Sequence, residues 1–205
     1  MVNDMVKMEI RSFTELGSPK LTEGRIIEGY AIVFNKESKI IYDKASRRAF
    51  IEIIDKEAVT EEMLLKCDIK AVLEHNIERM LARYRYGSGS LNLLLDDYGL
   101  KYSFEAPNTE EGNYAIEMIK RGDIFGSSFE YYTKENDPSC VSYSRKDGIL
   151  VRRVHKILLI TDISPVSDPA YWGTDVMVRS LQGTGLLHDT DENYLEQINN
   201  LEKLI

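Results

Sequence analysis

Short apolar runs separated by turn-forming residues dominate the chain and predict a fold built mainly of β-strands. Such runs, rich in Ile, Val, Tyr and Phe, lie at residues 8–13, 25–35, 69–74, 124–133 and 149–163. β-Branched and aromatic residues between turn signals favour strands. Residues 91–95 and 100–104 flank the turn sequence Asp96-Asp97-Tyr98-Gly99, which predicts a β-hairpin.

Three other segments have a helical pattern. Residues 60–65 begin with Thr60 as a predicted N-cap and two glutamates in the first turn. Residues 109–121 have acids at the start, apolar residues at helical spacing and a Lys-Arg-Gly ending. In residues 189–205 an apolar side chain recurs every three positions, as in an amphipathic helix.

The boundary of the main domain is expected near residue 180. The Gly183-Thr184-Gly185 stretch is typical of a linker. We therefore expect one β-dominated α+β domain at residues 1–180. A linker and an amphipathic C-terminal helix follow at residues 181–205.

Composition narrows the classes of function. The chain has 205 residues, 43% of them hydrophobic, which suffices for a sizeable core. Its formal net charge of −8 disfavours nucleic acid as a partner. No apolar run approaches the roughly 18 residues of a membrane span, so a membrane is not expected as a partner. HExxH, paired CxxC, P-loop and GxGxxG motifs are absent from the sequence, and we expect neither a metal nor a cofactor.

The histidines limit where acid–base chemistry can occur, because there are only three of them. His188 lies in the predicted linker, which leaves His75 and His155 as candidates for a rigid site. His75 follows a predicted strand, and Ser128 lies in the predicted strand segment Phe-Gly-Ser-Ser-Phe. Histidine is the usual base for a serine nucleophile. From the residues alone, His75 as an exposed turn histidine and Ser128 as a small residue on a crowded strand remain open interpretations.

Five motifs, in order, give the chain a resemblance to a known family. They are GYAIVFN at 29–35, His75 followed by Leu-Ala-Arg at 81–83, the Asp96–Leu100 turn, the Gly122–Phe129 segment GDIFGSSF, and Asp162-Ile163-Ser164 leading to Asp-Pro-Ala-Tyr at 168–171. In this order and spacing the chain resembles the prohead serine proteases of tailed bacteriophages, whose fold is shared by the herpesvirus assemblin proteases. The likeness covers roughly residues 24–179.

The resemblance implies an antiparallel β-barrel with flanking helices and a catalytic set. The base would be His75, the nucleophile Ser128 and the third member Asp162. His155 is the competing third member, since the assemblins use a second histidine. Arg152 and Arg153 are candidate oxyanion donors, alongside backbone N–H groups near residues 164–168.

The implied activity is cleavage of peptide bonds during capsid maturation, by way of an acyl-enzyme. The expected substrates are the scaffold segment of the major capsid protein, a separate scaffold protein and the protease itself. A second copy of the chain could also be a dimer partner. The expected location is the host cytoplasm, inside the assembling prohead. The alternative is a non-enzymatic scaffold or capsid-assembly protein, which would be mostly helical.

Overall fold

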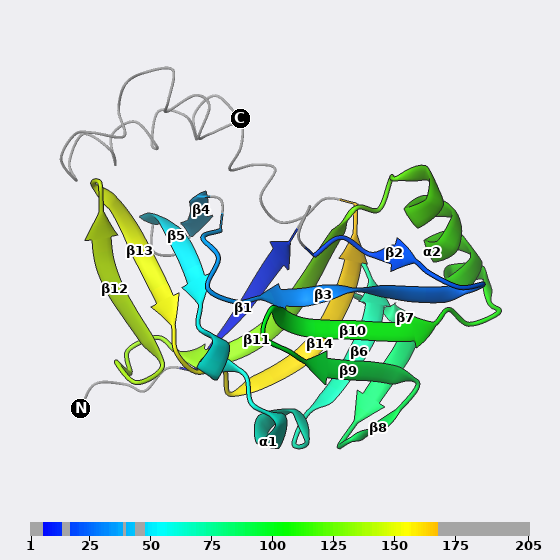
Figure 1. Ribbon diagram of the computed structural model, residues 1–205, viewed down its shortest axis with the longest axis horizontal. Coiled ribbons are helices and arrows are strands. Elements are labelled where there is room, and N and C mark those ends of the chain that lie inside the picture. Colours follow the sequence, from blue (N-terminus) through cyan, green and yellow to red (C-terminus); the bar gives the residue numbers. More distant parts are fainter. Residues whose placement is uncertain (1–5, 14–16, 39, 44–47, 168–205) are drawn as a thin grey trace.

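The computed structural model describes residues 6–13, 17–38, 40–43 and 48–167. Strands dominate these residues, with two α-helices and one short 3-10 helix, Lys56–Ala58, among them (Figure 1). The predicted linker and C-terminal helix at 181–205, the Asp-Pro-Ala-Tyr motif and His188 lie outside the described residues.

The largest sheet has six strands in the order β1-β11-β14-β6-β7-β8. Its strands are β1 (Val6–Phe13), β6 (Asp68–Leu73), β7 (Asn76–Arg85), β8 (Ser88–Gly89), β11 (Gly126–Lys134) and β14 (Leu159–Val166). β11 pairs antiparallel with β1 on one side and with β14 on the other. β1 is therefore the edge strand beside β11 in this sheet.

Two four-stranded sheets complete the described part. One has the order β2-β3-β10-β9, with strands Lys20–Leu21, Ile26–Val33, Gly99–Glu105 and Leu91–Leu95. The other has the order β12-β13-β5-β4, with strands Val141–Lys146, Ile149–Val154, Arg48–Ile54 and Ile40–Asp43. β9 and β10 are the hairpin predicted around the Asp-Asp-Tyr-Gly turn, and that prediction is confirmed.

The expectation of an antiparallel barrel needs correction, although the β-dominated fold is confirmed. The sheets are mixed, because β14 pairs with β6 in parallel and β13 pairs with β5 in parallel. Each of these pairs joins strands far apart in the sequence, whose relative direction no tight turn fixes. Within the described residues, no sheet closes into a barrel.

The helices α1 (Glu61–Leu64) and α2 (Glu110–Arg121) lie where the sequence predicted them. The Thr60 hydroxyl accepts from the Met63 amide, and the Thr109 hydroxyl accepts from the Gly112 amide. Gly122 ends α2 with φ = 79°, a left-handed conformation that glycine adopts without steric cost.

A single large core joins the six-stranded sheet to the β2-β3-β10-β9 sheet. Buried residues from both sheets belong to one cluster, including Ile32 and Phe104 from one and Ile69, Phe129 and Ile163 from the other. Figure 1 shows β3, β10 and β9 crossing the direction of β11, β14 and β6. β11 and β14 both contribute buried residues to this core, and both strands carry candidate site residues.

Candidate active site

His75 lies in a two-residue hairpin loop between β6 and β7. Leu73 pairs with Asn76, and both loop residues have positive φ, 53° for Glu74 and 54° for His75. Type I′ turns require positive φ at both positions, which costs non-glycine residues free energy. β14 and the residue after it hold this strained turn, because the Glu74 amide donates to the Pro165 carbonyl and the Glu74 carboxylate accepts from the Ser167 amide.

Sheet register brings Ser128 and Asp162 to one face. Ser128 on β11 pairs with Ser164 on β14, and Glu130 pairs with Asp162. Residues two apart on a strand share a face, and directly paired residues on neighbouring strands share it as well. Ser128, Asp162 and Ser164 therefore lie on the same side of the sheet, beside the hairpin that carries His75.

The three predicted site residues form a continuous hydrogen-bonded series. His75 Nε2 lies 2.6 Å from Ser128 Oγ, and His75 Nδ1 lies 2.8 Å from Asp162 Oδ1. With the proton on Nδ1 directed to Asp162, Nε2 is free to accept the Ser128 proton. The side chains of His75 and Asp162 are 21% and 13% exposed, whereas Ser128 is completely buried. The geometry is that of a serine nucleophile beside its base.

The neighbouring serine, Ser127, faces the opposite side of β11, because successive side chains alternate along a strand. Its hydroxyl lies 2.8 Å from the Tyr102 hydroxyl and donates to the Gly17 carbonyl. Only Ser128 of the two reaches the imidazole of His75.

Ser164 is a site residue to which the sequence reasoning gave no role. Its hydroxyl lies 3.0 Å from Asp162 Oδ1 and 3.3 Å from His75 Nδ1, and it accepts from the His75 backbone amide at 3.3 Å. The available signal was the acid-x-Ser spacing, because positions i and i+2 of a strand share a face.

Ser128 has a second partner on the edge strand β1. Its hydroxyl donates to the main-chain carbonyl of Arg11 at 2.9 Å. A serine hydroxyl has one proton, so the Arg11 carbonyl competes with His75 Nε2 for it. The described arrangement is thus a closed one, in which the hydroxyl is buried and shared between two acceptors.

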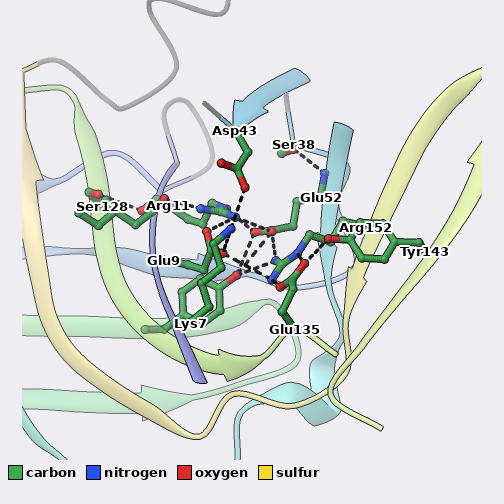
Figure 2. A network of polar contacts seen from close by, with 12 residues as sticks. Lys7, Glu9, Arg11, Ser38, Asp43, Glu52, Ser128, Glu135, Tyr143 and Arg152 are labelled. Carbon is green, nitrogen blue, oxygen red and sulfur yellow. Dashed lines mark hydrogen bonds and ion pairs between the residues drawn. The ribbon is translucent and has the colours of Figure 1, made fainter. Parts of the chain in front are cut away.

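The Arg11 side chain extends into a buried charge network at the other face of β1 (Figure 2). Its guanidinium contacts both Glu52 carboxylate oxygens, at 2.7 and 3.0 Å, and pairs with Glu9 at 2.8 Å. Arg152 binds Glu52 from the other side and pairs with Glu135 at 2.5 Å. Burial alone raises the pKa of Glu52, but the two arginines more than offset this and hold it below its ordinary value.

The predicted oxyanion donors have other partners. Arg152 is almost fully buried in the charge network, and Arg153 pairs with Asp55 at 2.5 Å. The Ser167 amide, in the segment predicted to supply backbone donors, donates to Glu74. The contacts of Arg152 and Arg153 therefore do not favour an oxyanion role for either arginine.

His155, the alternative third member, belongs to a separate cluster. His155 Nδ1 lies 2.7 Å from Asp55 Oδ2, and Nε2 lies 2.7 Å from Ser142 Oγ. His155 and Asp162 do not share a strand, because β13 ends at Val154 and β14 begins at Leu159. The structure brings Asp162 to His75 and leaves a second serine–histidine–aspartate series around His155.

Cys67 and Cys140 are buried free thiols, and burial raises the pKa of the Cys67 thiol, which disfavours a nucleophilic thiolate there. Within the described ranges, no group of three or more His, Cys, Asp or Glu side chains could hold a metal ion. None of the helices described is long and apolar enough to cross a membrane.

Comparison with known proteins places the chain in a family. The family model of the caudovirus prohead serine proteases matches residues 13–186. Among solved structures, the bacteriophage T4 capsid assembly protease gp21 is similar with a TM-score of 0.48 and 13% identity, over 80% of this chain and 99% of that one. That likeness is too distant to bear on function, and no curated protein matches. The family model covers most of the chain, which therefore belongs to the caudovirus prohead serine protease family.

Proposed function

We propose that the chain is a serine endopeptidase in which Ser128 is the nucleophile, His75 the general base and Asp162 the residue that orients His75. The observation that carries this proposal is the hydrogen-bonded series Asp162–His75–Ser128, with distances of 2.8 and 2.6 Å. Membership of the prohead serine protease family supports the same assignment.

The chemistry is acyl transfer in two steps. Ser128 Oγ attacks the carbonyl carbon of the scissile peptide while its proton passes to His75 Nε2. His75 then gives that proton to the leaving amine, and the peptide bond breaks to form an ester on Ser128. Water, deprotonated by His75, hydrolyses the ester and restores the serine. Throughout, Asp162 holds Nδ1–H and stabilises the imidazolium.

This reaction needs a change from the closed arrangement. Ser128 is completely buried, so a substrate peptide can reach it only after neighbouring segments of the protein move. The proton that Ser128 shares with the Arg11 carbonyl must also turn to His75 before attack. A chain that opens only in its working location would be held inactive elsewhere.

The substrates that the family suggests are the scaffold segment of the major capsid protein, a separate scaffold protein and the chain itself, inside the assembling prohead. The protease domain would span residues 1–180, with residues 181–205 as the segment removed or used for anchoring. One feature supports cleavage of its own C-terminal part. The last residue of β14, Val166, pairs with Gly126, two positions before Ser128, so the following chain starts beside the site.

The test is coexpression with the major capsid protein of the same phage. Wild-type protein is expected to process the capsid protein, and Ser128→Ala and His75→Ala are each expected to abolish processing. Ser142→Ala is the matched control, because Ser142 also hydrogen-bonds a histidine that an aspartate orients. Processing that survives Ser128→Ala and is lost in Ser142→Ala would move the active site to the His155 cluster.

A fluorophosphonate probe separates the protease from a non-enzymatic assembly protein. Mass spectrometry of the labelled peptide is expected to locate the adduct on Ser128. Absence of any adduct together with absence of processing would favour the assembly protein. Among the described residues, the small helical content argues against a helical scaffold.

A further inference from the structure

The buried hydroxyl of Ser164 contacts both the Asp162 carboxylate and the backbone of the turn that carries His75. It lies on β14 directly opposite Ser128, with no exposed surface. On one side it meets the Asp162 carboxylate, and on the other it meets the backbone amide of His75. We propose that Ser164 is a positioning residue of the proteolytic site, which fixes both the Asp162 carboxylate and the strained His75 turn. This inference rests on the proposed function of the same site.

Proton counting assigns the direction of each hydrogen bond. The His75 amide can only donate, so Ser164 Oγ accepts from it. The single Ser164 proton is then directed to Asp162 Oδ1, because an ionised carboxylate can only accept. Asp162 Oδ1 thus receives two donors, Ser164 Oγ–H and His75 Nδ1–H. Two donors on one oxygen restrain the carboxylate in the orientation that contacts the imidazole.

The contact with the His75 amide matters because of the turn. Glu74 and His75 both have positive φ, a conformation that persists only where surrounding contacts hold it. Ser164 supplies an acceptor to the amide of His75 itself, while Pro165 and Ser167 hold Glu74. Residues 164–167 of the chain therefore hold the turn, and Ser164 alone also contacts Asp162.

The second serine–histidine–aspartate series offers an internal comparison. In that series, Asp55 contacts His155 and also pairs with a cation, Arg153, at 2.5 Å. Arg153 neutralises part of the carboxylate charge that would stabilise an imidazolium on His155. Ser164 instead donates one neutral hydrogen bond and leaves the full charge on Asp162. This difference marks the His75 series as the one suited to general-base chemistry.

The test compares Ser164→Ala with Ser127→Ala, a change of another completely buried serine on the paired strand. Loss of a hydrogen bond to a charged group corresponds to about a tenfold to hundredfold change. Ser164→Ala is expected to lower kcat on a capsid-derived peptide by that factor with little change in KM. Ser127→Ala is expected to change kcat less than about threefold, because Ser127 contacts Tyr102 and Gly17 on the other face. Ser164→Thr, which keeps the hydroxyl, is expected to recover activity relative to Ser164→Ala.

A second readout does not depend on turnover. The His75 Nδ1 proton, held by Asp162, is expected as a low-field proton resonance in wild-type protein and in Ser127→Ala. In Ser164→Ala it is expected to move upfield or to be lost to exchange with water. An unchanged resonance and unchanged kcat in Ser164→Ala would overturn the positioning role. Wild-type protein that cleaves nothing, yet shows the resonance and its loss, would instead overturn the proposed function alone.

Discussion

Removing the charge of Glu52 tests whether the buried network stabilises the fold. Glu52 is 3% exposed and lies between two guanidinium groups, those of Arg11 and Arg152. The substitution Glu52→Gln keeps the size and shape of the side chain. It removes the negative charge and turns one acceptor oxygen into an NH₂ donor that faces a cation. The two arginines then remain buried with less compensation than before.

The expected loss in the free energy of unfolding depends on the ion pairs that Arg11 and Arg152 retain. Breaking a buried ion pair by removing one partner typically costs about 3–5 kcal/mol. Arg11 keeps its pair with Glu9 and Arg152 keeps its pair with Glu135, so we expect the lower end, about 3 kcal/mol. For a domain of this size, each kcal/mol lowers Tm by about 2–4 °C, which gives a decrease of about 6–12 °C.

Urea unfolding followed by circular dichroism measures the free energy of unfolding directly. The matched control is Glu62→Gln, because Glu62 is 81% exposed and pairs with Lys66 one helical turn away. An exposed pair of this kind contributes about 0.3–0.5 kcal/mol. If Glu52→Gln lowered the free energy of unfolding no more than Glu62→Gln does, the network would not stabilise the fold and the reasoning would be wrong.

Three further predictions concern pH, a helix end and access to the site. The pKa values of Glu52 and Glu135 lie below their ordinary value near 4.5, because arginine neighbours more than offset their burial. Their ionisation stabilises the fold above that pH, so urea unfolding should give a free energy that falls as the pH drops below about 4.5, and less steeply in Glu52→Gln. Gly122→Ala should cost about 1–2 kcal/mol in the same assay, since φ is 79° and an added Cβ meets no atom within 4 Å. Fluorophosphonate labelling of Ser128 should accelerate in subdenaturing urea, which opens local structure; a rate that only falls with urea would contradict the closed arrangement.

Features set by contacts between residues close in the sequence could be predicted from the sequence. The caps of α2, Thr109 and Gly122, are set by contacts within a few residues, and so is the hairpin turn at residues 96–99. The opposite orientation of Ser127 and Ser128 follows from strand alternation alone. The proximity of Ser128 to His75 could not be read in this way. It came from the resemblance, because the two residues are separated by 53 positions.

The buried charge network could not be predicted from the sequence, because charged residues that alternate along a strand usually indicate a solvent-exposed face. Lys7, Glu9 and Arg11 alternate along β1, a pattern that usually faces water. The burial of Arg11 depends on Glu52, 41 positions away, and Glu52 in turn pairs with Arg152, 100 positions further along the chain. The parallel β14–β6 and β13–β5 pairs also join strands that are distant in the sequence, and for this reason the expected antiparallel barrel did not include them.

The geometry of the site depends on strand register more than on any single contact. A slip of one residue between β11 and β14 would place Ser127 opposite Ser164 and turn the Ser128 hydroxyl toward the core. The irregularity in this pair falls between Glu130 and Tyr131, beyond the regular stretch that aligns Ser128 with Ser164 and Glu130 with Asp162. On the other side of β11, the buried ion pair of Arg11 with Glu52 anchors β1. The hydrogen-bonded series at His75 therefore relies on charges at the opposite face of the sheet, and Glu52→Gln should disturb Ser128 through β1 as well as weaken the fold.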